Sequence, residues 1–222
     1  MDSVTWDAIQ AAAGPMAIAM IKVTIPLTAI CFVVGLALAL IVALSRMSSR
    51  RYFSIPARVF ISAVRGTPLL VQLFLIFYGL PQFGVNLDPY IAAVIAFSVN
   101  VAGYAAEVIR ASILSVPRGQ WEAAETVGMG YTTTLKRIVL PQAARTAVPP
   151  LSNTLLSLLK DTSLASVVLV SEMFRKAQEF AGVNYQFFTL YALAAAYYWV
   201  VCFVLSLVQD RLEVRLDRYV AK

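Results

Sequence analysis

Two otherwise apolar segments of this chain carry polar side chains on one helical face. One stripe has Asn153, Ser157, Lys160 and Asp161 at i, i+4, i+7 and i+8, and the other has Asn100, Tyr104 and Glu107 at i, i+4 and i+7. Polar groups inside an apolar helix are costly and usually face a bundle interior or a water-filled path. The stripes therefore predict two helices that face each other across a pathway for a polar solute.

The chemistry that these stripes offer is reversible binding. Asn100, Asn153 and Ser157 supply amide and hydroxyl groups suited to a zwitterionic amino-acid backbone, and Thr154 adds only a hydroxyl. Gln72, in a third apolar segment, is a further pathway candidate. A cationic substrate would require a free carboxylate at this depth. Since Asp161 already has Lys160 beside it, the pattern favours a neutral or weakly polar substrate.

The charged residues of the stripes also have structural interpretations. Lys160 and Asp161 could be structural charges that neutralise Glu107 or backbone carbonyls instead of contacting substrate. Glu107 could form an ion pair with Arg110, one turn away. Both alternatives stay open at the level of sequence.

Several kinds of catalysis are excluded by what the chain lacks. It contains no histidine, which removes Ser–His nucleophile pairs and HExxH zinc sites. Cys31 and Cys202 both lie in apolar runs, which favours small buried side chains over a redox pair. No GxxxxGK[ST] phosphate-binding loop is present, so the chain cannot hydrolyse ATP itself. We expect no catalytic residue, no metal site and no cofactor bound by this chain.

The amino-acid composition indicates which medium surrounds these helices. Hydrophobic residues make up 60% of the 222 residues, charged residues 14%, and the mean hydropathy is +0.76. Soluble domains have about 45–50% apolar and about 25% charged residues. The net charge of +6 comes from basic residues between apolar runs, which is typical of membrane proteins and not of nucleic-acid binding. The sequence predicts an all-α membrane protein.

Five segments are long and apolar enough to span a bilayer in a single domain, 1–222. A span needs about 20 apolar residues, and the expected spans are residues 16–44, 59–80, 90–113, 150–170 and 187–208. Basic residues gather in the connections after the first and third spans and in the tail after the fifth: Arg46, Arg50, Arg51, Arg58 and Arg65; Arg118, Lys136, Arg137 and Arg145; Arg211, Arg215, Arg218 and Lys222. The positive-inside rule places the N-terminus outside and the C-terminus in the cytoplasm.

The long connection after the third span contains a predicted amphipathic helix, residues 120–131. Trp121, Ala124 and Val127 or Gly128 recur at three- to four-residue spacing, with Glu122 on the polar side. One interpretation is a helix lying on the bilayer surface, but its glutamates would then face anionic lipid.

The same connection resembles a known family. The residues Glu122-Ala123-Ala124, Gly128, Ile138, Leu140 and Pro141 are similar to the EAA motif of ABC importer permeases. Residues 65–72, 104–111 and 150–164 resemble the polar amino-acid branch of that family (histidine, glutamine and cystine type), and residues 77–84 and 157–165 look closest to L-cystine permeases.

The resemblance implies a type I ABC importer permease fold in a bacterial inner membrane. Such a subunit translocates its substrate, here L-cystine or a similar neutral polar amino acid, while a separate ATPase holds ATP and Mg²⁺. Trp121, Ala124 and Val127 would contact the ATPase and Glu122 would pair with one of its basic residues. A second permease subunit, identical or related, and an external substrate-binding protein complete the expected assembly.

Two other functions fit part of the pattern. A stand-alone carrier or channel driven by an ion gradient could use Lys160, Asp161 and Glu107 as an ion relay. It would have no reason to keep the helix at 120–131. A membrane scaffold without transport would leave the two polar stripes unexplained.

Overall fold

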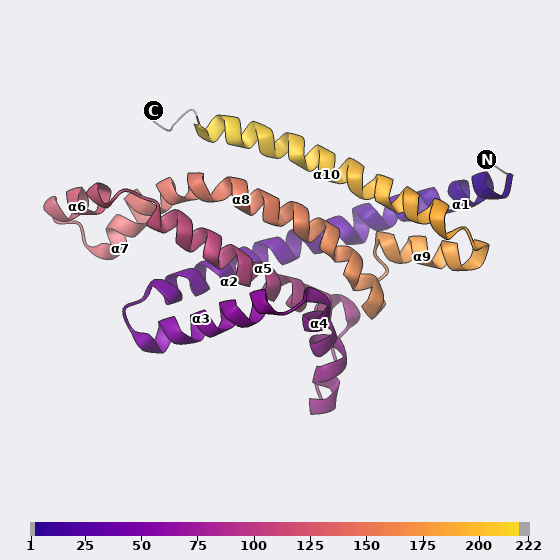
Figure 1. Cartoon of the computed structure of the whole chain (residues 1–222), viewed down its shortest axis with the longest axis horizontal. Helices are drawn as coiled ribbons and strands as arrows, with labels where there is room; N and C mark the ends of the chain where they lie inside the picture. Colours follow the sequence, from indigo (N-terminus) through magenta and orange to yellow (C-terminus); the bar gives the residue numbers. More distant parts are fainter. Residues whose placement is uncertain (1–2, 218–222) are drawn as a thin grey trace.

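The computed structural model describes residues 3–217, and every regular element in that range is a helix. Most helices run along the long axis of the molecule, and one short segment turns away from it (Figure 1). Arg218 and Lys222, which belong to the predicted basic tail, lie outside the described residues.

The first span is longer than the predicted 16–44. Helix α1 (Ser3–Ala19), the π-helical turn η1 (Met20–Thr24) and α2 (Ile25–Met47) form one apolar run from Thr5 to Met47. The N-terminal segment therefore continues the span as helix.

Three wide π-helical turns each precede a proline. The turns η1, η2 (Leu75–Gly79) and η4 (Leu135–Val139) each end two residues before a proline, at Pro26, Pro81 and Pro141. A proline has no N–H and its ring clashes with the carbonyl four residues earlier. The wider turn accommodates that carbonyl, so the chain stays helical through each proline.

The second predicted span, 59–80, is not straight. Helix α3 (Arg51–Gly66) meets the next segment at 107°. That segment comprises α4 (Leu69–Phe74), η2 and the 3₁₀ turn η3 (Leu80–Phe83), and Figure 1 shows it pointing away from the other helices. The cause is local: a residue before proline is disfavoured in the helical region, and Thr67, before Pro68, is extended with φ −122° and ψ 145°.

The second half of the chain is also built of helices and helical turns. Its elements are α5 (Pro89–Leu114), α6 (Arg118–Thr126), α7 (Tyr131–Thr134), η4, α8 (Leu140–Asp161), the 3₁₀ turn η5 (Thr162–Val168), α9 (Met173–Asn184) and α10 (Phe187–Asp217). Helix α5 coincides with the predicted 90–113, whereas α8 begins ten residues before the predicted 150 and α10 continues beyond 208. The helix predicted at 120–131 ends at Thr126.

By length and apolarity, three helical runs in the described part of the chain could cross a membrane. The number rises to five if each of two bent pairs, 51–83 and 131–184, counts as one span. The predicted fourth span is thus a helix bent by 50° where η5 leads into α9.

Helix α5 lies at the centre and packs closely against its neighbours through small residues. A Cβ atom on Gly35 of α2 would lie 2.5 Å from Val101 Cγ1, and one on Gly103 would lie 2.5 Å from Val64 Cγ1 of α3. Small residues let helix backbones approach closely in membranes. Both contacts lie on the α5 turn between Asn100 and Tyr104.

A buried carboxylate joins three elements at the N-terminal end of the molecule. Glu172 is fully buried and caps α9 by accepting hydrogen bonds from the N–H groups of Phe174 (2.8 Å) and Arg175 (2.6 Å). The Tyr198 hydroxyl on α10 donates to Glu172 at 3.0 Å, and the Met173 N–H donates to Thr24 Oγ1 at 3.1 Å. These bonds join η1, α9 and α10.

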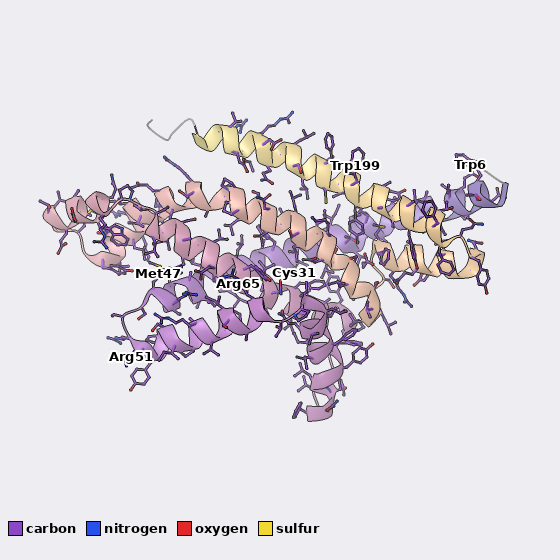
Figure 2. The ribbon with its side chains drawn as sticks, in the orientation of Figure 1. Trp6, Cys31, Met47, Arg51, Arg65 and Trp199 are labelled. Atoms are coloured by element: carbon purple, nitrogen blue, oxygen red, sulfur yellow. The ribbon has the colours of Figure 1, made fainter. Side chains whose placement is uncertain are left out.

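The outer surface of the helices is apolar. Trp199 on α10 is 68% exposed and lies on the outward side of that helix (Figure 2). Exposed side chains such as Val33 and Ile41 continue the apolar surface along α2. This surface is what a bilayer would cover.

The predicted basic regions gather at one end of the molecule. The α2–α3 connection, helices α6 and α7 and the end of α10 lie together there, while α9 and the start of α1 lie at the opposite end (Figure 1). Among the described residues, the α2–α3 connection, the α6–α7 region and the end of α10 therefore share one end, and Arg65 lies nearer the middle of the molecule (Figure 2).

The close α2–α5 contact predicts a clear stability effect. Gly35→Ala would force a methyl group against Val101 and within 3.1 Å of the Ser98 carbonyl oxygen, and should lower the free energy of unfolding by about 1–3 kcal/mol. Gly14→Ala is the matched control, since nothing lies within 4 Å of its Cβ position. Thermal unfolding of both purified variants in detergent measures the difference. An equal melting temperature for both would contradict the packing argument.

Candidate functional site

A cavity of about 380 Å³ lies between α5, α8 and the α3–α4 bend. Residues of both predicted stripes line it, Asn100 and Tyr104 from one and Asn153, Ser157 and Asp161 from the other, together with Thr154. Thr67, Pro68 and Leu69 of the bend close one side, and Val101, Pro150 and Leu158 add apolar surface. The structure thus brings the two stripes together around one cavity.

The helical register explains why these residues share a face. Asn100 and Tyr104 are one turn apart on α5, and Asn153, Ser157 and Asp161 occupy successive turns of α8. Because α8 packs against α5, the two rows of polar groups face a common volume. The cavity offers amides, hydroxyls and one carboxylate.

The sequence predicts that Gln72 lines the pathway. In the structure it bonds to Asn100, which lines the cavity, and is not itself among the lining residues. Its Nε2 donates to the Val64 carbonyl at 2.8 Å and to Thr67 Oγ1 at 2.9 Å, across the α3–α4 bend. Its Oε1 accepts from Asn100 Nδ2 at 3.1 Å. Gln72 therefore holds the bend and orients Asn100, and it does not line the cavity.

Lys160 does not face this cavity either. It is exposed and lines a separate hollow with Ser163, Phe174 and Tyr198. Successive residues of an α-helix point about 100° apart, because one turn holds about 3.6 residues. Asp161 therefore lines the first cavity and Lys160 a different hollow, although the charge of Lys160 still acts on the Asp161 carboxylate.

Glu107 has partners that settle its structural role. Arg46 Nη1 donates to it at 2.8 Å and Arg110 Nε at 3.0 Å. The pairing with Arg110 confirms one of the two interpretations from sequence, whereas Arg46, sixty-one residues away, could not be found by local spacing. Neither Lys160 nor Asp161 is a partner of Glu107 in an ion pair that the structure describes.

Residues of the α3–α4 bend also line the cavity, which the sequence alone did not predict. Thr67 and Leu69 enter the cavity because the chain turns there by 107°. The signal was present in the Gly66-Thr67-Pro68 sequence, since glycine and proline mark a break in a helix.

The predicted ATPase-contacting helix, α6, is oriented differently from expectation. Ala124 is only 2% exposed, and the ring of Trp121 stacks on Tyr131 with a centroid distance of 5.7 Å. Both residues pack against the chain itself, whereas Glu122 and Ala123 are exposed and Val127 is 75% exposed. Gly128 follows with φ +77°, a conformation that ends the helix.

Comparison with known proteins identifies the fold. Residues 35–218 match the model of the family described as "Binding-protein-dependent transport system inner membrane component". The chain belongs to this family.

Two relatives align with nearly the whole length of this chain. It is 58% identical over 221 residues to the L-cystine transport system permease protein TcyB of Bacillus subtilis, which covers 99% of this chain and 94% of the relative. It is 39% identical over 206 residues to the probable amino-acid ABC transporter permease protein YckA of the same organism, with 93% and 91% coverage.

A solved structure supports the same assignment. The chain superposes on a crystal structure of an amino acid ABC transporter with histidines at a TM-score of 0.89, with 34% identity and coverage of 97% of this chain and 100% of the other. The protein is thus a multi-pass inner-membrane permease subunit of an amino-acid ABC importer with a type I permease-like fold.

The bonds of Gln72 predict a measurable cost for removing its amide. Gln72→Leu leaves the Val64 carbonyl and the Asn100 amide without this partner, and should lower the free energy of unfolding by about 1–3 kcal/mol. Gln82→Leu, at an exposed position of η3, is the control and should have little effect. Chemical or thermal unfolding in detergent compares them, and equal stability would contradict the positioning role of Gln72.

Proposed function

We propose that this permease carries L-cystine, or a similar neutral polar amino acid, into a bacterial cytoplasm. The observation that carries the proposal is the lining of the 380 Å³ cavity. Its amides and hydroxyls suit the charged ends of a zwitterion, and Asp161 can pair with an ammonium group. The 58% identity to an L-cystine permease supports the same substrate.

The cavity lining also argues against a fully cationic substrate. Asp161 is the one carboxylate among the side chains that line it in the described structure. The charge of Lys160, the next residue, already acts on the Asp161 carboxylate, so the site offers no unbalanced carboxylate to an additional cationic side chain. A neutral amino acid brings one carboxylate for each of its ammonium groups and needs no further counter-ion.

The subunit works within a larger assembly. The family description, "binding-protein-dependent", supports an external substrate-binding protein as a partner. The described part of this chain offers three to five spans, too few to enclose an alternating pathway, so a second permease subunit completes it. ATP and Mg²⁺ are held by separate ATPase subunits, and this chain binds no cofactor or nucleic acid.

Helix α6 is the contact with the ATPase. It lies at the end of the molecule that carries the basic connections (Figure 1), and the positive-inside rule makes that end cytoplasmic. The N-terminus is then external and the C-terminus internal. Glu122, Val127 and Gly128 are exposed there, while Trp121 and Ala124 brace α6 against the chain. Closure of the ATPases moves α6 and rocks the spans around the cavity.

Uptake by the assembled complex in proteoliposomes tests the proposal. We expect ATP-dependent accumulation of radiolabelled cystine, with weak competition from arginine, glutamine and histidine. Preferential transport of arginine would overturn the substrate assignment. Uptake that is independent of ATP and abolished by a protonophore would favour the gradient-driven carrier.

The coupling role of α6 makes a separate prediction. Glu122→Lys reverses an exposed charge at the ATPase contact and should reduce ATP-driven uptake at least about tenfold, because a lost interfacial charge pair costs about 2–5 kcal/mol. Stimulation of the ATPase by loaded binding protein should be lost in parallel. Glu125→Lys, an equal change on the same helix, is the control and should keep uptake near the wild-type rate. Equal rates in both variants would argue against a specific contact at Glu122.

A further inference from the structure

A second cavity, of about 510 Å³, adjoins the first at Tyr104. It is lined by Arg46 of α2, by Arg58, Ser62 and Arg65 of α3, and by Tyr104 of α5. Tyr104 also lines the first cavity, and Thr67 of the first cavity is two residues from Arg65. The two cavities therefore meet at one aromatic side chain and at the end of α3.

The second cavity is strongly basic. Arg46 is neutralised by Glu107, but Glu107 also binds Arg110, so one carboxylate serves two guanidinium groups. Neither Arg58 nor Arg65 forms an ion pair with any carboxylate that the structure describes. The cavity thus presents positive charge that its own walls do not balance, which makes it a site for an anion.

Arg65 lies at the boundary between the two cavities. Its guanidinium carbon is 5.6 Å from the centroid of the Tyr104 ring, a cation–π contact. Figure 2 shows Arg65 at the opposite end of α3 from Arg51, toward the middle of the molecule. Arg65 is exposed and also interacts electrostatically with Glu107, but it forms no ion pair that the structure describes. It can therefore turn toward a substrate carboxylate, since a charge-assisted pair is stronger than the contact with Tyr104.

Continuity with the first cavity at Tyr104 favours the transported amino acid over lipid as the source of that anion. Arg58, Ser62 and Arg65 recur at four- and three-residue spacing along one face of α3. The exposed apolar residues Ile55 and Val59 lie seven and three residues before Ser62 on the same side of α3, so the direction of this row does not exclude lipid. The shared Tyr104 lining joins this cavity to the first one, which a substrate occupies under the proposed function.

We propose that this basic cavity is a second binding station for the carboxylate groups of the transported amino acid, reached past Tyr104, with Arg65 as the residue that receives them. The inference rests on the proposed function. The first cavity pairs the substrate's ammonium group with Asp161, and the second pairs its carboxylates with Arg65 and Arg58. An amino acid with a net positive charge is disfavoured in the second station, which adds a charge filter on the cytoplasmic side.

Cysteine labelling tests the electrostatics of the cavity. In the assembled complex with Cys31→Ala and Cys202→Ala, Ser62→Cys should react at least about tenfold faster with an anionic than with a cationic methanethiosulfonate reagent, because unbalanced charge concentrates the counter-ion. Adding Arg65→Gln should lower this ratio. Thr126→Cys on α6, outside the cavity, is the control and should show no anionic preference. A ratio near one at Ser62→Cys would overturn the proposal.

Lipid composition separates the two sources of an anion. The labelling is repeated in vesicles of phosphatidylcholine alone and with increasing phosphatidylglycerol. Because an anionic membrane repels an anionic reagent, the rate at Ser62→Cys is divided by the rate at Thr126→Cys, and we expect this ratio to stay constant. Protection that grows with phosphatidylglycerol would assign the cavity to a lipid headgroup and overturn its role as a substrate station.

Transport by Arg65 variants tests the role of the second station. Arg65→Gln should lower the maximal rate of cystine uptake about tenfold, the loss of one charge-assisted hydrogen bond, while loaded binding protein still stimulates the ATPase. Arg65→Lys should restore part of the rate, because it keeps the charge. Arg51→Gln, on the same helix outside the cavity, is the matched control and should transport normally.

The outcomes distinguish this inference from the proposed function. Equal uptake by Arg65→Gln and Arg51→Gln, in a complex that transports cystine, overturns the second station alone. Absence of ATP-driven cystine uptake in the wild-type complex overturns the proposed function as well.

Discussion

The side-chain amide of Gln72 holds the bend on which the cavity depends. It bonds the last turn of α3 and Thr67 on one side and Asn100 of α5 on the other. Pro68 disfavours the helical conformation at Thr67, so the chain breaks, and the freed polar groups require new partners in a medium without water. One glutamine supplies them and fixes a 107° turn between α3 and the segment that follows. Without this turn, Thr67 and Leu69 would not reach the cavity.

Close helix packing sets the position of the other wall. Gly35 and Gly103 let α2 and α3 approach α5 so closely that a methyl group at either position would overlap a valine. Lipid tails are as apolar as the helices, so packing of this kind, more than hydrophobicity, decides which faces meet. The faces left over bear apolar side chains such as Trp199, and the polar face of α5 lines the first cavity.

The distribution of charge follows from helical geometry. Lys160 and Asp161 are neighbours in sequence but serve different surfaces, because consecutive residues on a helix diverge. Glu107 balances Arg46 and Arg110 from two different helices. The first cavity thus contains one carboxylate among its described lining residues, and the second contains an excess of arginine. A zwitterion carries an ammonium group that complements the carboxylate and a carboxylate that complements the arginines.

The sequence by itself determined the membrane environment, the helical class, the two polar stripes and the family, because composition, periodicity and motif spacing are local properties of the chain. It also predicted that Asn100 and Asn153 face a common path, since each stripe marks the side of its helix that cannot face lipid. Only the tertiary structure decided that Gln72 orients Asn100, that Lys160 turns away, that Ala124 is buried and that Arg46 reaches Glu107. Each of these depends on which helices touch and at what angle, and that is set by contacts between residues far apart in the chain.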